Sequence, residues 1–502
     1  MRKRAALLLF AFTCSIMAAR GAAGPPLRVC LVSGSEEYKS DVSLAAFQKH
    51  LEQRYNAQCT FITARNNSDL PGLDALENCD VALFFTRRLT TGGDPLERVK
   101  KYCTSGRPIV AVRTACHGFQ NWLEFDKLVL GGSYTGHFGA GTTAKMAIEP
   151  GGKNHPVLDG VVPIRSRSSL YKCGPAAPDC TVLLTGSTPL SSGSQPVAWT
   201  RVSNGGRVFF TSLGAPEDFE NATFQRMIAN ALFWTAKRDV ERKELDAPPQ
   251  RPKPDGALHL ILRTRMEAAK GSGIWEEKTI ERTVPVAETA ILICDMWDAH
   301  WCRGASERCA ALAKKMAPVV NAARARGVQI IHCPSDTLYF YTDQPQRRRM
   351  TLAPAVAPPK PLDLPNPPLP IDDSDGGCDT GEKPGYPAWT RQSPLLDIGE
   401  YDGIADSGAE VYNFMAQQGI KNLILMGVHT NMCVLGRTFA IRQMTKWGVP
   451  CVLVRDLTDA MYDPKDRPYV THEEGTELVV QYIEKYWCPT TLSAEFTAGL
   501  PK

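Results

Sequence analysis

The sequence predicts an α/β protein made of two doubly wound, three-layer domains with mainly parallel sheets. Short apolar runs that end at glycine or at polar residues alternate with amphipathic helical patterns along both halves of the chain. A chain of 502 residues is too long for a single hydrophobic core, and a stretch rich in proline and charge divides it near residue 250. The motifs of the two halves do not match, so we expect two different domains and no internal repeat.

The first domain is expected over residues 27–238. Its predicted strands are short apolar runs at residues 27–34, 59–64, 80–86, 107–112 and 206–212. Apolar residues recur at helical spacing over residues 41–55 and again over residues 224–238. This alternation favours a parallel sheet with helices on both faces.

A linker follows over residues 239–258, and the second domain is expected over residues 259–490 with a tail at 491–502. The period-two patterns of residues 259–268 and 276–286 predict a hairpin at the start of this domain. Further strands are predicted at residues 289–295, 328–333, 421–427 and 450–456, and helices at 309–327, 411–419 and 438–448. Residues 352–389 hold many prolines without periodicity, which is typical of a functional loop or of a surface excursion.

The first 24 residues have the pattern of a signal peptide. Arg2, Lys3 and Arg4 precede an apolar stretch and then small residues suited to cleavage near residues 19–23. We therefore predict export to the bacterial periplasm or the extracellular space, with an uncleaved anchor as the alternative. No later segment is apolar enough for a membrane span, so none is expected after cleavage.

The net charge of +4 at pH 7 comes from this first segment, which contains four basic residues (Arg2, Lys3, Arg4 and Arg20) and no acidic residue. The remaining chain is near neutral, which argues against a nucleic-acid partner.

The chain has sixteen cysteines, and cleavage would leave an odd number, so at least one stays unpaired. Cys173 with Cys180, or Cys302 with Cys309, would close small disulfide loops in an oxidising compartment.

Three residues of the second half suggest nucleophilic chemistry. Asp295 ends a buried strand, and open α/β sheets place their ligands at that end. Cys433 follows the strand at 421–427 and precedes a helical pattern, where the positive helix end would lower the thiol pKa. Arg391 precedes the cysteine and offers a cation.

These residues resemble the motifs of the isochorismatase-like hydrolases, the superfamily that includes nicotinamidases. The segment "GVHTNMCV" (427–434) is similar to the cysteine motif of that family, and "ICDM" (293–296) to its aspartate motif. The resemblance covers about residues 285–485. It implies that Cys433 is the nucleophile and Asp295 the base, and that the peptide bond between Val428 and His429 is cis. The backbone N–H groups of His429 and Cys433 would form the oxyanion hole.

The same resemblance gives Arg391 the place of the family's lysine. An arginine keeps the positive charge but cannot shuttle a proton. Nicotinamidases hold a metal through an Asp-x-His pattern, and this chain has Asp336 but Leu338 where the histidine belongs. We therefore predict no metal and no other cofactor.

The segment after Asp295 is rich in aromatic residues. Asp298 and His300 in "DAHWC" (298–302) would suit a metal, but an aromatic turn that lines a pocket is the favoured interpretation. Trp297, His300, Trp301 and Asn431 are the predicted substrate-pocket residues.

The first half resembles the trehalose-utilisation (ThuA-like) branch of the class I glutamine amidotransferase-like fold. The similar segments are "LVSGSEEY" (31–38), "VRTACHGF" (112–119), "LGGSYTGHFG" (130–139) and "NHPVLDG" (154–160). Thr114 stands where the amidotransferase nucleophile elbow carries glycine. The resemblance implies a pocket that contains His117 and His137, together with Cys116, whose alternative is a buried strand-end thiol.

The sequence thus predicts an exported cysteine hydrolase that acts on an amide or related C–N or C–O bond of a small molecule, fused to a sugar-related domain. The alternative is a non-catalytic protein that binds a small molecule or a carbohydrate. A homo-oligomer is compatible with either function.

Overall fold

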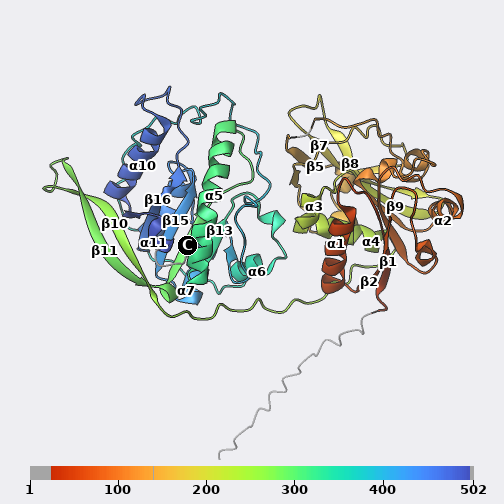
Figure 1. Cartoon of the computed structure of the whole chain (residues 1–502), viewed down its shortest axis with the longest axis horizontal. Helices are drawn as coiled ribbons and strands as arrows, with labels where there is room; N and C mark the ends of the chain where they lie inside the picture. The colour runs from red at the N-terminus through yellow and green to blue at the C-terminus, as the bar shows by residue number, and fades with distance from the viewer. Residues whose placement is uncertain (1–23, 140, 498–502) are drawn as a thin grey trace, which may run out of the picture.

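The computed structural model describes residues 24–139 and 141–497, so the predicted signal peptide lies outside the described residues except for its last position. Figure 1 shows two α/β domains joined by an extended segment that runs from the end of the first domain to the long hairpin of the second. Both domains have mixed, mainly parallel sheets with interleaved helices, and the predicted fold class is confirmed.

The first domain has a sheet of nine described strands in the order β2-β1-β3-β4-β9-β8-β7-β5-β6. The pairs β2–β1, β1–β3, β3–β4 and β4–β9 are parallel. The pairs β9–β8, β8–β7, β7–β5 and β5–β6 are antiparallel. The strands are β1 (Leu27–Gly34), β2 (Ala57–Thr63), β3 (Val81–Thr86), β4 (Ile109–Val112), β5 (Ala144–Ile148), β6 (Arg165–Ser166), β7 (Thr181–Ser187), β8 (Gln195–Ser203) and β9 (Gly206–Thr211).

Helices cover both faces of this sheet. Leu31 of β1 packs in one apolar cluster with Leu44 and Phe224, whereas the next residue, Val32, packs in a second cluster with Val99. Both faces of β1 are therefore buried, which explains its uninterrupted apolar sequence. The helices are α1 (Ser40–Arg54), α2 (Gly93–Thr104), α3 (Pro216–Glu220) and α4 (Ala222–Thr235), with short helical turns η1 (Leu73–Glu77), η2 (Arg113–His117), η3 (Asp126–Leu130), η4 (Pro150–Gly152) and η5 (Pro156–Leu158).

The second domain has a sheet of eight described strands in the order β11-β10-β17-β16-β15-β12-β13-β14. The pairs from β17 to β14 are parallel, and the hairpin β10–β11 extends the sheet as antiparallel edge strands. The strands are β10 (Ala257–Glu267), β11 (Trp275–Pro285), β12 (Thr289–Cys294), β13 (Gln329–Cys333), β14 (Gly403–Ile404), β15 (Asn422–Val428), β16 (Cys451–Asp459) and β17 (Thr490–Thr491).

This sheet is also buried on both faces. Leu292 of β12 packs with Val411 and Val479 on one face, and its neighbour Ile293 packs with Leu312 on the other. The helices are α5 (Arg303–Ala325), α6 (Pro345–Thr351), α7 (Gly408–Gln418), α8 (Cys433–Gly436), α9 (Ile441–Lys446), α10 (His472–Tyr486) and α11 (Ala494–Thr497), with turns η6 (Val286–Glu288) and η7 (Leu338–Phe340).

The structure differs from the sequence prediction in two places. The antiparallel strands β5 to β8 were not predicted, because their runs are interrupted by glycine, proline and polar residues. The predicted tail at 491–502 begins inside β17, and the side chain of Phe496 in α11 is fully buried. That part of the tail is a packed element of the second domain. Among the described residues, no helix combines the length and the apolar character that a bilayer crossing requires.

Candidate active site

Two neighbouring parallel strands bring Asp295 and the cysteine motif together. β12 pairs with β15, and Cys294 lies opposite Gly427 in the register. Asp295 follows β12 with a φ of 46°, and Gly427 has a φ of 120°. A Cβ atom at residue 427 would collide with the carbonyl oxygen of Cys294, so only glycine allows this close approach of the strand ends.

The Asp295 carboxylate is completely buried at the end of β12. Its Oδ1 accepts a hydrogen bond from the backbone N–H of Ser335 at 2.7 Å, and its Oδ2 accepts one from Nε of Arg437 at 3.1 Å. Burial raises the pKa of Asp295, while Arg437, the Cys433 thiol and Ser335 lower it in part. The outcome is a carboxylate with a raised pKa, which suits a general base.

Cys433 begins the short helix α8, and its thiol lies close enough to the Asp295 carboxylate and the Arg437 guanidinium for both to shift its pKa. Burial and the adjacent Asp295 charge raise the pKa of the thiol, and Arg437 opposes them only partly. The lowered thiol pKa that we predicted from the helix N-terminus is therefore wrong, because the partial burial of Cys433 and the Asp295 charge outweigh a helix of only four residues. Cys433 is therefore a neutral thiol beside a buried carboxylate.

The motif residues between the strand and the helix have the backbone arrangement that the resemblance implied. The peptide bond between Val428 and His429 is cis. The N–H groups of Met432 and Val434 both donate to the His429 carbonyl oxygen, at 3.0 and 3.1 Å. In contrast, the N–H groups of His429 and Cys433 have no hydrogen-bond partner among the described residues, so they remain available as donors.

The cation beside Asp295 is Arg437 and not Arg391, which corrects the sequence prediction. Arg391 forms an ion pair with Glu220 of the first domain, and its guanidinium lies 5.3 Å from the ring centre of Phe340. Arg437 follows the nucleophile by one helical turn, where its guanidinium reaches back to the end of β12. That i to i+4 spacing was the signal in the sequence that could have revealed it.

The three predicted aromatic pocket residues lie together and gain a fourth partner. Trp297 stacks on Trp389 with ring centres 4.4 Å apart and an interplanar angle of 11°. His300 stacks on the same Trp389 at 5.6 Å and touches Trp301 at 5.0 Å. The His300 ring also meets the His429 ring edge-on at 5.0 Å, which joins the aromatic group to the cysteine motif.

Burial lowers the pKa of His300 to about 3 and that of His429 to about 4, so both imidazoles are neutral. Trp389 was not predicted as a pocket residue, because it ends a proline-rich loop without any periodic pattern.

Asn431 was predicted to line the pocket, but its polar atoms bind neighbouring chain segments instead. Its Nδ2 donates to the Asp373 carboxylate at 2.7 Å and to the Met461 carbonyl oxygen at 3.1 Å, and its Oδ1 accepts from the N–H of Met461. Asn431 therefore holds the cysteine motif against the long loop and the segment after β16.

Comparisons with known proteins agree with the two predicted resemblances. Residues 28–235 match the family model "Trehalose utilisation" (ThuA), and residues 289–468 match the model "Isochorismatase domain". The chain is a ThuA domain fused to an isochorismatase domain. No curated protein matches it.

Solved structures similar to parts of this chain include the following three. A ThuA-like protein from Parabacteroides merdae has 17% identity, covers 45% of this chain and 95% of its own, and gives a TM-score of 0.35. A cysteine hydrolase from Pseudomonas syringae pv. phaseolicola has 17% identity, covers 42% of this chain and 92% of its own, with a TM-score of 0.28. An isochorismatase family protein from Burkholderia thailandensis has 16% identity, with coverages of 42% and 93% and a TM-score of 0.25.

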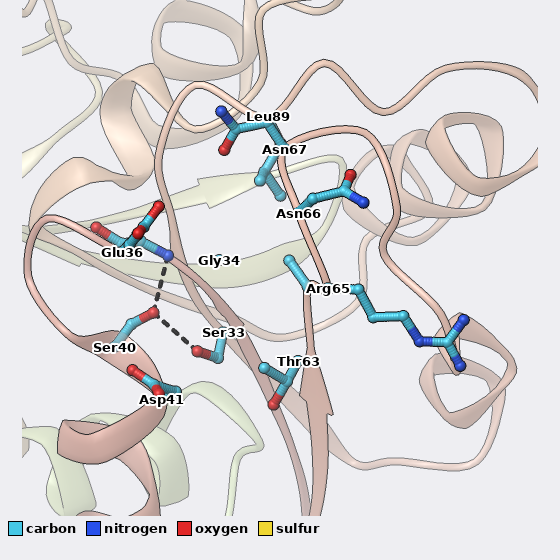
Figure 2. A pocket seen from close by; sticks show the side chains of 12 residues that line it. Ser33, Gly34, Glu36, Ser40, Asp41, Thr63, Arg65, Asn66, Asn67 and Leu89 are labelled. Carbon is cyan, nitrogen blue, oxygen red and sulfur yellow. Dashed lines mark hydrogen bonds between the residues drawn. The ribbon is translucent and has the colours of Figure 1, made fainter.

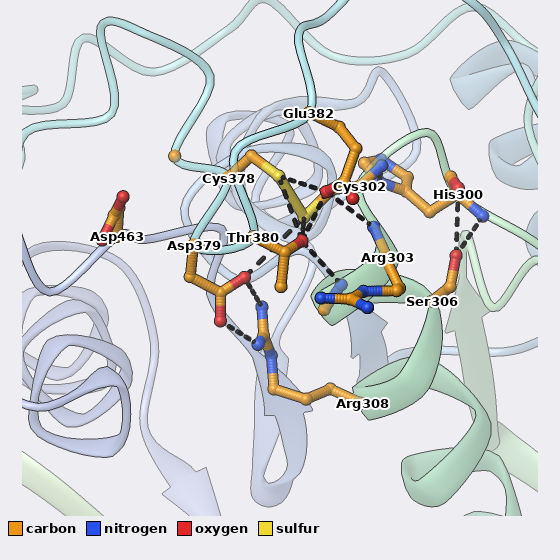
Figure 3. Close-up of a disulfide and its surroundings, with 12 residues drawn as sticks. His300, Cys302, Arg303, Ser306, Arg308, Cys378, Asp379, Thr380, Glu382 and Asp463 are labelled. Atoms are coloured by element: carbon orange, nitrogen blue, oxygen red, sulfur yellow. Dashed lines mark hydrogen bonds and ion pairs between the residues drawn. A yellow bond between two sulfur atoms is a disulfide. The ribbon is translucent and has the colours of Figure 1, made fainter.

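A disulfide of the isochorismatase domain joins the long loop to α5. Cys302, immediately before α5, is bonded to Cys378 (Figure 3), and the two cysteines are 76 positions apart in sequence. Neither small loop considered from the sequence forms, because Cys173, Cys180 and Cys309 are free. The same figure shows Arg308 bound to Asp379, a second connection between α5 and the loop.

The possible metal ligands of the isochorismatase domain are engaged elsewhere. Among the described residues, one group has ligand atoms close enough for an ion, namely Cys302, Cys378 and Glu382, and its two sulfurs are bonded to each other. The Asp336 carboxylate lies 3.6 Å from the Arg437 guanidinium, and the Asp298 carboxylate accepts hydrogen bonds from Thr390.

The ThuA domain places Cys116 and His117 together at the end of β4. The Cys116 thiol lies 3.2 Å from Nδ1 of His117 and 3.2 Å from the Arg113 carbonyl oxygen. His117 stacks on Tyr134 at 4.6 Å, whereas the exposed His137 lies 6.4 Å from the Tyr171 ring. Burial raises the pKa of Cys116 well above its usual range and lowers the pKa of His117 to about 4.

The strained turn after β4 carries Arg113 and not the cysteine. Arg113 has a φ of 50° and is fully buried between Tyr38 and Tyr171, with its guanidinium 4.5 Å from each ring centre. In a nucleophile elbow the strained residue is the nucleophile itself. An arginine at this position leaves Cys116 three residues away, inside the turn η2.

A polar cavity of about 180 Å³ lies beside this turn, at the carboxyl ends of β1 and β2 (Figure 2). The Ser40 hydroxyl hydrogen-bonds Ser33 and accepts from the N–H of Ser35, each at 2.8 Å. The Ser35 hydroxyl oxygen in turn accepts a hydrogen bond from the hydroxyl of Thr114 in η2 at 3.1 Å. Asn66, Asn67 and Arg65 complete one wall of the cavity.

Proposed function

We propose that the isochorismatase domain is a cysteine hydrolase that acts on an amide or a related C–N or C–O bond of a small molecule. The observation that carries this proposal is one buried contact group, in which the Asp295 carboxylate meets both the Cys433 thiol and the Arg437 guanidinium. The backbone N–H groups of His429 and Cys433, which have no partner within residues 24–139 and 141–497, belong to the same motif. Nucleophile, base, cation and oxyanion donors are the groups that acyl transfer requires.

In the first half of the proposed reaction, the Cys433 sulfur attacks the carbonyl carbon while its proton moves to Asp295. The N–H groups of His429 and Cys433 then bind the oxygen that becomes negative. Asp295 returns the proton to the leaving nitrogen or oxygen as the bond to carbon breaks, and a thioester remains on Cys433.

In the second half, a water molecule gives a proton to Asp295 as its oxygen attacks the thioester carbonyl. The oxyanion again accepts from the two backbone N–H groups. The C–S bond then breaks, Asp295 protonates the departing sulfur, and the acid product leaves.

The electrostatics of the contact group support transfer of the proton during attack. Because burial raises the thiol pKa, little free thiolate exists before substrate binds. The raised pKa of Asp295 brings the two proton affinities closer, and Arg437 stabilises the negative charge whichever group holds it. Arg437 keeps its own proton throughout.

The test combines turnover with chemical labelling. We expect wild-type protein to hydrolyse at least one member of a panel of small amides and isochorismate-type substrates, and Cys433→Ala to hydrolyse none. We expect Asp295→Asn to lose about 10²- to 10⁴-fold in kcat, the usual contribution of a general base. Cys180→Ala is the matched control, because Cys180 is a free, partly exposed thiol of the ThuA domain.

Iodoacetamide labelling followed by mass spectrometry should modify Cys433 in the wild type. Equal turnover by the wild type and Cys433→Ala would remove the mechanism.

For the ThuA domain we propose a binding role. The strained turn holds the buried Arg113 where a nucleophile would stand, and the adjacent cavity is lined by serine and asparagine side chains that suit sugar hydroxyls. Thermal shifts with a panel of mono- and disaccharides test this role. We expect Ser40→Val to abolish any shift that the wild type shows, and persistence of the shift in Ser40→Val would place the ligand elsewhere.

A further inference from the structure

A short segment of the ThuA domain lies against the loops that carry the hydrolase site. The guanidinium of Arg165 in β6 donates to the Asp336 carbonyl oxygen at 2.6 Å. Arg167, two residues later, donates to the Asp298 carbonyl oxygen at 3.0 Å. Asp298 follows β12 and Asp336 follows β13, the same two strand ends that deliver Asp295 and Ser335. The ThuA domain therefore touches the segments next to the reacting groups.

Asp336 connects the two sets of residues directly. Its backbone carbonyl oxygen accepts from Arg165, and its carboxylate lies 3.6 Å from Arg437, whose Nε binds Asp295. The Arg165 guanidinium also lies 5.6 Å from the ring centre of Trp389, which stacks on Trp297. Arg165 of the ThuA domain is thus connected to Arg437 through a single residue, Asp336, and it lies next to the ring of Trp389.

The ThuA domain also braces the loop that bears Trp389. The hydroxyl of Thr143, just before β5, donates to the Ala388 carbonyl oxygen at 2.6 Å. The hydroxyl of Tyr386 donates in turn to the Thr143 carbonyl oxygen at 2.6 Å. The aromatic wall of the hydrolase site is therefore held in place from the other domain.

Two cavities border Arg165, and both are lined by the two domains together. The larger, about 460 Å³, is bounded by Lys145, Arg165, Asp336, Tyr339 and Trp389 among others. The second, about 380 Å³, is bounded by Arg165, Arg167, Asp218, Asp298 and Thr390 among others. Their volumes suit a small molecule or part of one.

The charges around these cavities favour an anionic ligand. The buried acidic groups are already engaged: Asp218 accepts from Ser166 and from the N–H groups of Gly214 and Ala215, and Asp298 accepts from Thr390. Glu217, which also borders the second cavity, is exposed to solvent. In contrast, Nε of Arg165 is buried without a hydrogen-bond partner, and Lys145 has no ion-pair partner among the described residues. Arg167 lies at 4.0 Å from the Asp298 carboxylate, a loose ion pair with a half-exposed guanidinium.

We propose that the substrate site spans both domains and that Arg165, with Arg167 beside it, binds a carboxylate of an amide substrate whose carbonyl faces Cys433. This inference rests on the proposed hydrolase function for the identity of the reacting bond. A guanidinium presents paired N–H donors that match a carboxylate, which a lysine does not reproduce. The fusion of the two domains then has a direct purpose, because one domain supplies the reaction and the other recognises the charged end of the substrate.

The test measures binding without turnover. Full-length Cys433→Ala protein is titrated in a calorimeter with straight-chain amide acids from malonamate to adipamate, and with the neutral amides of the same chain lengths. We expect at least one amide acid to bind more tightly than its neutral counterpart. Adding Arg165→Gln should weaken that binding about tenfold or more, as expected for loss of a charged hydrogen bond, and leave the neutral amide nearly unchanged.

Arg207→Gln is the matched control. Arg207 is also half-buried, donates to a backbone carbonyl oxygen (that of Trp234, at 2.9 Å) and lies 4.7 Å from a tryptophan ring, but it does not border either cavity. Arg165→Lys should recover only part of the lost affinity. If Arg165→Gln fails to fold, Arg167→Gln, a change at an exposed side chain, should likewise weaken binding of the amide acid and leave the neutral amide nearly unchanged.

Unchanged affinity in both glutamine variants, or equal binding of acids and neutral amides, would overturn the two-domain site. An equal loss for acids and neutral amides would mean that Arg165 only holds the domains together, which also overturns it. The proposed hydrolase function has its own contrary outcomes. It is wrong if Cys433→Ala still turns over substrate, or if the wild type does not turn over an amide acid that it binds.

Discussion

Replacement of Arg437 by glutamine tests the electrostatics of the site most directly. The Asp295 carboxylate is fully buried, and Arg437 is the one cation in the described part of the chain that hydrogen-bonds it. Removing one partner from a buried ion pair typically costs about 3–5 kcal/mol, because the remaining charge stays buried alone. The Arg437 side chain is 34% exposed, so water already screens part of this interaction. We therefore expect a loss of about 2–3 kcal/mol.

If that energy is lost from the transition state, kcat/KM for any substrate of the wild type should fall about 30- to 150-fold, since each 1.36 kcal/mol is tenfold. The same variant should raise the pKa of Asp295 further and move the acid limb of the rate profile to higher pH. Its destabilisation relative to the wild type should grow as pH rises from about 4 to 7, because the isolated carboxylate is then forced to ionise.

The assays are steady-state kinetics and urea unfolding at several pH values. Arg326→Gln is the control, because Arg326 belongs to the same domain and donates only to the Ala257 carbonyl oxygen at 3.1 Å. Near-normal activity of Arg437→Gln together with a large loss in Arg391→Gln would refute the reasoning and return the role to Arg391.

Three further predictions concern stability. Reductant, or serine at both Cys302 and Cys378, should lower the free energy of unfolding in urea by about 2–4 kcal/mol, and reductant should not affect the double variant further. Burial opposes ionisation of Asp402, but hydrogen bonds from His332 and Arg324 outweigh it and lower its pKa to about 2. The stability that this carboxylate contributes, about 2 kcal/mol, should be complete above pH 4 or so and be lost as pH falls through about 2, and Asp402→Asn should remove this acid dependence. Phe496→Ala should cost about 3–5 kcal/mol in urea unfolding, whereas a free tail would show no change.

The sequence predicts the parallel parts of both sheets well, for a physical reason. Strands such as β1 and β12 are buried on both faces, so their sequences are uninterrupted apolar runs that need no knowledge of their neighbours. The antiparallel strands β5 to β8 depend on pairing with each other, and their mixed sequences carry a weaker signal. The same holds for α11, whose four residues are helical because Phe496 packs against the rest of the domain.

By itself, the sequence determined the two α/β domains and the places of Asp295 and Cys433, because both residues stand directly at the ends of strands in local, recognisable motifs. The tertiary structure decided which cation lies beside Asp295, which cysteines pair, and that the ThuA domain contacts the segments after β12 and β13. Those outcomes depend on distances between segments far apart in the chain. Arg437 and Arg391 carry the same charge in the sequence, and only the packing of the two domains, which gives Arg391 to Glu220, separates their roles.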